Sequence, residues 1–168
     1  MVWAVNTNPM TLFEFSSDKG TANWYDQNDT VMGGVSSSQM LYTDEGAKFT
    51  GEVSLENNGG FAQVQYDKTD FDLSGYEGLE LRVKGKPKTY QLRLDTDAER
   101  VTYSQSFEAS ENWTTLQLPF TDFEGVFRGR SVPDAPPLAL DNIRRIGFLI
   151  SDRQEGSFEL LIDHIKAY

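Results

Sequence analysis

Apolar and polar residues alternate along most of the chain, with a period of two. In the segment 47–57, Phe49 and Val53 fall on one face, and Lys48 and Glu52 fall on the other. The same alternation recurs in four later segments, at 78–85, 90–94, 146–150 and 158–162. A period of two is typical of β-strands that have one face in the core and one face in water.

Turn-forming residues separate these segments, and no segment carries a sustained helical period. Gly, Pro, Asn and Asp gather at 56–61, 84–90, 95–100, 109–113 and 152–158. Single helical turns are the most that we expect, near 120–127 and 138–145. Strands at short intervals without crossover helices predict an all-β fold, an antiparallel sandwich or barrel.

The chain length fits one domain. A chain of 168 residues can bury about 70% of its unfolded surface, which is enough for a real core. No internal repeat or linker interrupts it, so we expect a single domain over 1–168. The longest irregular stretch, 129–140, holds three prolines, and we interpret it as an ordered loop between late strands.

Composition narrows the function classes. The net charge of −11 argues against nucleic acid as a partner, because most of the surface would repel phosphates. The chain has no cysteine, which excludes disulfides and thiolate chemistry. We find no signal or transit peptide and no apolar run of the ~20 residues that a membrane span needs. We therefore expect a soluble, cytoplasmic protein, either free or peripheral at a membrane.

The segment 28–38, "NDTVMGGVSSS", raises the question of a phosphate-binding or catalytic loop. It has neither the G-x-x-x-x-G-K-[ST] nor the G-x-G-x-x-G spacing, and no helical pattern follows it. The structural interpretation is that Gly33 and Gly34 allow a tight bend or a close approach of another strand. We favour that interpretation over direct ligand contact.

Other catalytic and metal-binding patterns are weak. His164 is the only histidine, and no G-x-S-x-G motif accompanies it, so a structural role is favoured over a Ser–His–Asp triad. Asp95, Asp97 and Glu99 could hold calcium, but the segment lacks the Gly and the distal Glu of an EF-hand loop. A solvated acidic turn is the favoured alternative. We expect no metal and no cofactor.

Arginines gather late in this acidic chain. Arg128 and Arg130 bracket Gly129, and Arg144 and Arg145 follow soon after. Four arginines near one irregular loop could form a fork-like site for carboxylate or phosphate groups. They could equally pair with the acidic residues of the protein itself, and both alternatives stay open.

Five sequence blocks follow one another in a recognisable order. They read NDTVMGGVSS, FTGEVSLENNGGFA, LSGYEGLELRVKG, WTTLQLPFTDF with FRGR, and IRRIGFLISDRQEGSFELLIDHI. In this order they resemble the complex I intermediate-associated protein 30 family, over about 13–168. The resemblance implies a galactose-binding-like domain, an antiparallel jelly-roll β-sandwich, with a shape shared by many carbohydrate-binding modules.

The resemblance also implies a function. The best-known family members act as assembly factors for mitochondrial respiratory complex I, and photosynthetic relatives can be fused to dehydrogenase-like domains. We therefore predict a non-catalytic, chaperone-like assembly factor that docks on protein subunits of a membrane-associated respiratory or photosynthetic complex. A carbohydrate-binding protein is the alternative, because many aromatic rings could stack on sugars. An enzyme that uses a carboxylate pair ranks third.

The candidate binding residues come from the family's turns and from the arginine pair. They are Asn28, Asp29, Met32, Gly33, Gly34, Asn58, Gly59, Gly60, Arg128 and Arg130. Our hypothesis is that the two arginines and the adjoining NDTVMGG turn form a contact patch. Their positive charge in an acidic chain would orient an acidic partner, because guanidinium groups bind carboxylates bidentately.

Overall fold

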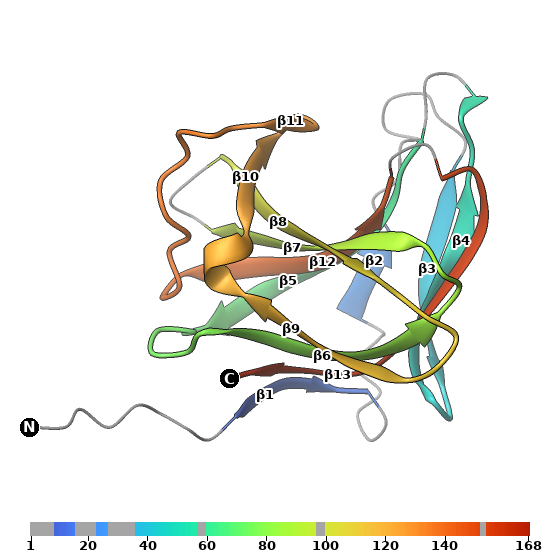
Figure 1. Cartoon of the computed structure of the whole chain (residues 1–168), viewed down its shortest axis with the longest axis horizontal. Helices are drawn as coiled ribbons and strands as arrows, with labels where there is room; N and C mark the ends of the chain where they lie inside the picture. Colours follow the sequence, from blue (N-terminus) through green and yellow to red (C-terminus); the bar gives the residue numbers. More distant parts are fainter. Residues whose placement is uncertain (1–8, 16–22, 27–35, 57–59, 97–99, 152–153) are drawn as a thin grey trace, which may run out of the picture.

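Two antiparallel β-sheets pack face to face in the computed structural model (Figure 1). The structure describes residues 9–15, 23–26, 36–56, 60–96, 100–151 and 154–168. The first sheet has the order β3 (Ser37–Thr43), β4 (Gly46–Val53), β13 (Gly156–Ala167), β6 (Gly78–Gly85) and β9 (Thr114–Pro119). β1 (Met10–Glu14) also pairs with β13.

The second sheet contains seven strands. Their order is β11 (Arg130–Ser131), β10 (Glu124–Phe127), β8 (Thr102–Glu108), β7 (Thr89–Thr96), β12 (Ile143–Ile150), β5 (Ala62–Phe71) and β2 (Trp24–Asp26). The pairings within both sheets are antiparallel. The predicted antiparallel jelly-roll β-sandwich is confirmed.

Among the described residues, helical structure is limited to short turns, as the missing helical period predicted. The short 3-10 helix η4 (Phe120–Asp122) lies within the first expected turn. In the second, the Asn142 amide donates to the Ala139 carbonyl over 3.2 Å before β12 begins. The described part of the chain contains no helix with the length and apolar character of a membrane span.

The core lies between the two sheets and contains the apolar positions of the alternating segments. Leu79, Leu81 and Val83 of β6 are fully buried, as are Leu92 and Leu94 of β7. A continuous chain of ring contacts crosses this core from sheet to sheet. Its members, in order, are Phe13, Trp24, Phe148, Phe107, Tyr90, Phe158 and Phe49. Burying these rings ties seven strands together by hydrophobic contact.

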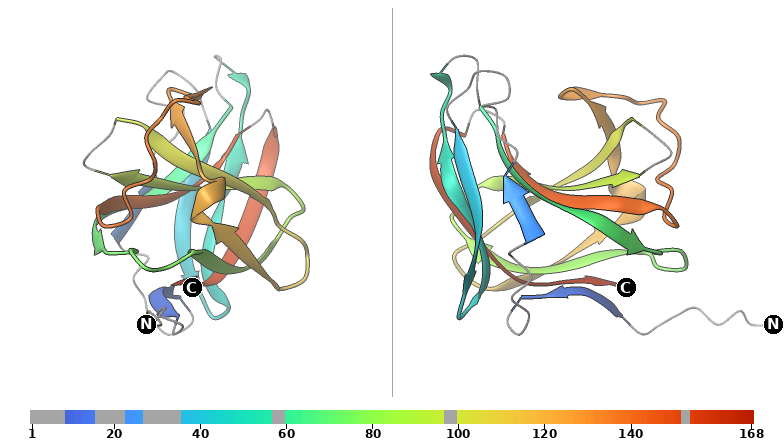
Figure 2. Two further views of the ribbon diagram at one scale, coloured as in Figure 1. Left: turned by 60° about the vertical axis from the view of Figure 1, so that its left-hand side comes forward. Right: turned by 180° about the vertical axis from the view of Figure 1, so that it is seen from behind.

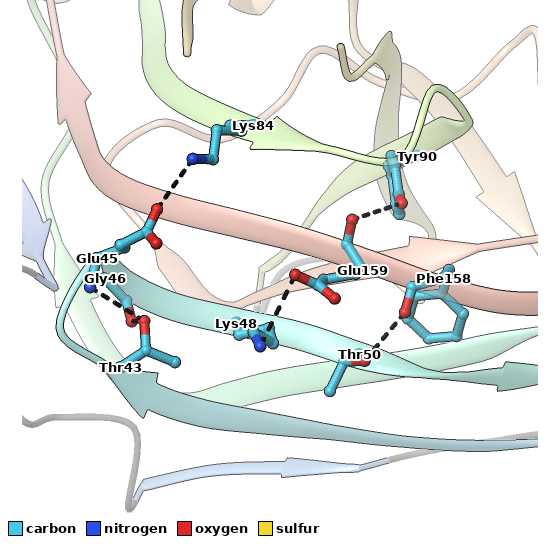
Figure 3. Close-up of polar contacts among 9 residues, drawn as sticks. All are labelled: Thr43, Glu45, Gly46, Lys48, Thr50, Lys84, Tyr90, Phe158 and Glu159. Atoms are coloured by element: carbon cyan, nitrogen blue, oxygen red, sulfur yellow. Dashed lines mark hydrogen bonds and ion pairs between the residues drawn. The ribbon is translucent and has the colours of Figure 1, made fainter. Parts of the chain in front are cut away.

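One polar contact joins the two sheets through the core. Tyr90, on β7 of the second sheet, is fully buried, and its hydroxyl donates to the Glu159 carbonyl on β13 over 3.2 Å (Figure 3). A buried hydroxyl needs a partner, because leaving it unpaired costs free energy. Burial raises the pKa of Tyr90 to about 12.

The second sheet is bordered by a hairpin at one edge. β10 and β11 rise from that edge away from β6 and β13 of the first sheet (Figures 1 and 2). The proline-containing segment that follows is ordered, as predicted. The Tyr103 hydroxyl donates to the Pro136 carbonyl over 2.6 Å, which fixes this segment against β8.

Candidate functional site

The side chains that face away from the core on the second sheet form rows across its strands. In the middle row, Tyr25 pairs with Gln65, Gln65 with Gly147, Gly147 with Arg93, and Arg93 with Ser104. These five positions come from β2, β5, β12, β7 and β8. The pairing therefore brings residues that are up to about eighty positions apart in sequence onto neighbouring strands, which lie about 4.8 Å apart.

Two further rows flank the middle one. The first contains Gln63, Leu149, Gln91 and Ser106. The second contains Asp67, Arg145 and Asp95, and Thr102 extends it through a hydrogen bond to Asp95. We call the polar side chains of the middle row and of the row that contains Gln63 the polar floor. Its members are Tyr25, Gln63, Gln65, Gln91, Arg93, Ser104 and Ser106, with Gly147 at the centre.

Several residues of the polar floor are buried although they face away from the core. Gln63, Gln65 and Ser104 are 6%, 7% and 9% exposed. Two of the contacts that orient them are short: Ser104 Oγ donates to Gln91 Oε1 over 2.8 Å, and the Tyr25 hydroxyl donates to Gln65 Oε1 over 2.9 Å. The polar floor is therefore a preorganised hydrogen-bonding surface rather than a set of loose surface side chains.

Arg93 and Gly147 lie side by side at the centre of the polar floor. A Cβ at Gly147 would lie 2.8 Å from the Val64 carbonyl oxygen and 3.3 Å from Gln65 Cγ, so only glycine fits beneath the glutamine side chains of β5. Arg93 Nε is buried without a hydrogen-bond partner among the described residues. Burial lowers the pKa of Arg93, and the charge of Asp95 opposes that shift.

The charged row next to the polar floor holds two carboxylates that share one guanidinium, so one net negative charge remains. Arg145 Nε lies 2.6 Å from Asp67 Oδ1, and Arg145 Nη1 lies 3.5 Å from Asp95 Oδ2. Burial alone would lower the pKa of Arg145, but the Asp67 hydrogen bond and the two carboxylate charges raise it overall. The sequence left open whether the arginines bind a ligand or pair with acidic residues of their own chain. Arg145 does the latter.

We expect Arg145→Ala to lower the free energy of unfolding by about 1 kcal/mol, a typical value for a partly exposed ion pair. Removing the guanidinium leaves Asp67 and Asp95 without their shared counter-charge, so the loss should shrink as salt screens the site. Urea denaturation at low and high salt measures both effects. Arg100→Ala, at an exposed arginine, is the matched control, and an equal loss there would contradict the prediction.

The tip of the β10–β11 hairpin presents arginine and phenylalanine to solvent. We define the hairpin tip as Phe127–Arg130. Arg128 and Gly129 form its two-residue turn with φ angles of 51° and 78°, and both central residues of a type I′ turn require such positive angles. Phe127 is 42% exposed, and the Arg128 guanidinium carbon lies 5.3 Å from the centre of its ring.

Arg128 and Arg130 are both exposed, and in the described part of the chain neither is ion-paired with an acidic residue. Within the same residues, Arg128 is the one non-glycine residue at positive φ. That conformation costs an arginine about 1 kcal/mol or more. The hairpin tip thus keeps a cationic side chain at a position where glycine would be less strained.

The acidic turn offers no metal site in the residues that can be placed. Asp95 is engaged by Arg145 and by Thr102 Oγ1, whereas Asp97 and Glu99 lie outside the described residues. Elsewhere among the placed residues, no group of three His, Cys, Asp or Glu side chains is arranged to hold a metal ion.

His164 lies on the outer face of the first sheet, at a β-bulge. The register of β13 against β6 shifts between Ile162 and His164, and Ile162 and Ile165 are both fully buried. Asp163 and His164 occupy the two positions between them. His164 Nε2 lies 3.0 Å from Glu80 Oε2, and Nδ1 lies 3.2 Å from Asp163 Oδ2. Because both ring nitrogens contact carboxylates, the geometry supports the structural role predicted for this histidine.

The rest of that outer face carries paired charges (Figure 3). Lys48 Nζ lies 3.7 Å from Glu159 Oε1, and Lys84 Nζ lies 2.9 Å from Glu45 Oε2. Such exposed pairs contribute little to stability, but they keep the net charge of the face low. The two outer faces therefore differ: paired charges cover much of the first sheet, whereas amides, hydroxyls and the partly buried Arg93 dominate the polar floor.

A pocket lies beside the hairpin, under the proline-containing segment. It has a volume of about 580 Å³ and is lined mainly by apolar side chains from η4, β8, β10 and the segment 132–140, including Phe120, Phe123, Tyr103 and Leu138. Its lining also includes Glu124, which pairs with the floor residue Ser104, so the pocket adjoins the β10 end of the polar floor.

Comparison with known proteins identifies the family. Residues 13–162 match the family described as complex I intermediate-associated protein 30. The chain belongs to this family. Complex I intermediate-associated protein 30 of mouse mitochondria is 26% identical over 181 residues, which cover 94% of this chain and 55% of the mouse protein. The chain thus spans about half the length of this relative.

Two further comparisons concern a second relative and a solved structure. An uncharacterized protein of Schizosaccharomyces pombe is 25% identical and covers 86% of this chain and 80% of its own length. Among solved structures, a family 11 carbohydrate-binding module of a Clostridium thermocellum cellulase superposes with a TM-score of 0.67 at 20% identity, over 95% of this chain and 94% of the module. At that identity the likeness shows the shared fold alone.

The structure places three of the ten residues predicted for the binding site of this family member. Arg128 and Arg130 lie at the hairpin tip, and Gly60 lies just before β5, with β12, β7 and β8 between it and β10 in the sheet. The other seven lie outside the described residues: Asn28, Asp29, Met32, Gly33, Gly34, Asn58 and Gly59. The proposed patch of arginines and NDTVMGG turn therefore stays a prediction.

Sequence reasoning missed the polar floor, although two local patterns pointed to it. In the segment 62–66, "AQVQY", two glutamines alternate with core residues, which places both on one face of a strand. Gly147 interrupts an otherwise apolar strand, and an isolated glycine in a strand indicates a close approach of another group. Neither pattern shows that these residues meet Arg93.

Proposed function

We propose that this chain is a non-catalytic assembly factor that docks on protein subunits of a membrane-associated complex through the hairpin tip. Membership of the complex I intermediate-associated protein 30 family supports the assembly role. The observation that carries the docking site is the exposed Phe127–Arg130 turn. It presents arginine, a residue type enriched at interface positions that dominate binding energy, and phenylalanine, which is enriched at interfaces in general.

Charge supports the choice of partner. The chain has a net charge of −11, so the hairpin tip is a local positive region on an acidic protein. Arginines that are not ion-paired with their own chain can bind carboxylates of a partner bidentately without first breaking a native ion pair. The proposed contact is therefore with an acidic segment of the partner subunit.

The backbone strain at Arg128 separates docking from internal bracing. If Arg128 braced the fold, replacing it would lower stability. If it serves a partner, Arg128→Gly should leave stability unchanged or raise it by up to about 1 kcal/mol, because glycine adopts positive φ without strain. The same change should lower partner binding at least tenfold, because a central interface arginine contributes well over 1 kcal/mol.

The experiment expresses tagged wild-type chain, Arg128→Gly, Arg130→Ala and the control Arg100→Ala in the source cells. Mass spectrometry quantifies co-purified subunits of membrane complexes, and thermal unfolding measures the stability of each variant. We expect wild type and Arg100→Ala to recover the same subunits and the two hairpin variants to lose them with unchanged unfolding temperatures. Lower unfolding temperatures with subunits retained would make the arginines internal braces. Recovery of no complex subunit by wild type would contradict the assembly role.

A further inference from the structure

The polar floor has more hydrogen-bonding capacity than the fold uses. Arg93 Nε is buried and unpartnered within the described residues, although an unpaired buried donor costs about 1–3 kcal/mol. Gln63, Gln65 and Ser104 are nearly buried on the side of the sheet that faces away from the core. A fold that only needed a solvated outer face would not require buried polar groups there, so the floor is arranged for a ligand.

The chemistry of the floor favours an uncharged, hydroxyl-rich ligand. Amides and hydroxyls of Gln65, Gln91 and Ser104 can each donate and accept, which matches sugar hydroxyls that also do both. Asp67 and Asp95 share the single counter-charge of Arg145, and Glu124 pairs with Ser104 at the end of the middle row. An anionic ligand would lie beside these carboxylates in an acidic protein, so Arg93 alone does not make the floor an anion site.

The shape of the floor favours an extended ligand that lies across the strands. The middle row runs from Tyr25 on β2 through Gly147 to Ser104, and Glu124 on β10 continues it. Five strand spacings of about 4.8 Å make this row roughly 24 Å long. At its centre the Gln63 and Gln65 side chains lie over Gly147, so a ligand there would meet the glutamine amides rather than the backbone.

An aromatic ring marks one end of the row. Tyr25 is 36% exposed, and its hydroxyl oxygen lies 2.9 Å from both Gln65 Oε1 and Asp67 Oδ1, to either of which it can donate its one proton. This hydrogen bonding fixes the ring while part of it stays open to solvent. A fixed, partly exposed ring at the end of a polar row suits stacking against the apolar face of a sugar ring.

From these observations we propose that the polar floor binds a neutral, linear oligosaccharide, with Arg93, Gln65 and Ser104 bonding its hydroxyls and Tyr25 stacking on one ring. This site uses no residue of the hairpin tip. It is therefore a second binding activity, and its test needs no partner protein.

Isothermal titration calorimetry of the purified chain provides the test, with cellohexaose, laminarihexaose and maltohexaose as neutral probes and hexagalacturonate as the acidic probe. We expect saturable binding of at least one neutral hexasaccharide and much weaker binding of the acidic one. Arg93→Met and Gln65→Ala should each lower the affinity about tenfold or more, whereas Arg100→Ala should leave it unchanged. Thermal unfolding of each variant verifies its fold.

Tyr25 provides a second, graded measurement. Tyr25→Phe keeps the stacking ring and loses only the fixing hydroxyl, so we expect a smaller loss of affinity than for Tyr25→Ala. The proposal would be overturned if no neutral hexasaccharide bound at millimolar concentration, or if the floor variants bound as wild type does. Preference for hexagalacturonate, or displacement of the sugar by an uncharged polar peptide, would assign the floor to a different ligand and equally overturn it.

Discussion

Trp24→Ala is expected to lower the free energy of unfolding by about 3–5 kcal/mol, the range for removing a buried large aromatic side chain. Trp24 is 7% exposed, and its ring lies 5.4 Å from Phe13, 5.7 Å from Tyr66 and 6.0 Å from Phe148. It therefore joins β2 to strands of both sheets. Because β2 has three residues, of which Trp24 alone is buried, and pairs only with β5 among the described strands, this ring is the strand's main contact with the core.

Trp24→Phe is the matched control, with an expected loss of less than about 1.5 kcal/mol because most of the apolar volume is retained. Trp24 Nε1 is buried with no hydrogen-bond partner in the placed residues, so phenylalanine loses no hydrogen bond. Urea denaturation followed by far-UV circular dichroism measures both variants. A loss below 1 kcal/mol for Trp24→Ala would show that the ring chain does not carry the core. Trp24→Ala should also weaken sugar binding, because it releases the neighbouring Tyr25.

The strand pattern of this fold was predictable because burial imposes it on each strand separately. The segments 78–85, 146–150 and 158–162 lie within strands β6, β12 and β13, and their apolar positions form the core. That signal is local, since alternate side chains of any strand point to opposite faces. The alternation breaks at His164, where the bulge puts two consecutive residues between core positions. No residue type in that segment predicts a bulge.

The polar floor was not predictable, because it depends on register between strands that are distant in sequence. Gln65 meets Gly147, and Gly147 meets Arg93, only because β12 pairs with both β5 and β7 in one particular alignment. A shift of one residue would put these side chains on the core face. The hairpin tip was more accessible to sequence reasoning, since all four of its residues are contiguous and the glycine marks the turn.

The two candidate surfaces differ in the kind of ligand they suit. The hairpin tip is cationic, exposed and held by a two-residue turn, which suits an acidic protein segment. The polar floor combines buried amides and hydroxyls with partly exposed side chains, and it lies beside carboxylates that outnumber Arg145, which suits a neutral ligand. Salt should therefore weaken the first interaction and leave the second almost unchanged. This difference allows the two activities to be separated in one protein without mutation.

Tyr90 should make the fold lose stability at alkaline pH. Burial raises the pKa of its phenol to about 12, above the value of 10.0 for an unburied tyrosine. The folded state thus favours the neutral phenol. The contribution of this phenol to the free energy of unfolding is fully present below pH 10. It is lost as pH rises from 10 to 12, because the unfolded chain releases the proton first. Two pKa units correspond to roughly 2–3 kcal/mol.

Comparing wild type with Tyr90→Phe isolates this group from the other residues that titrate at high pH. Near neutral pH, Tyr90→Phe should be less stable by about 1 kcal/mol, because it loses the hydrogen bond to the Glu159 carbonyl. Between pH 10 and 12 the difference should shrink and then reverse, since phenylalanine has no proton to lose. Urea denaturation at several pH values measures both curves, and the tyrosinate absorbance of the folded protein reports the phenol directly. Parallel curves would mean that the Tyr90 hydroxyl is not held in the core between the two sheets.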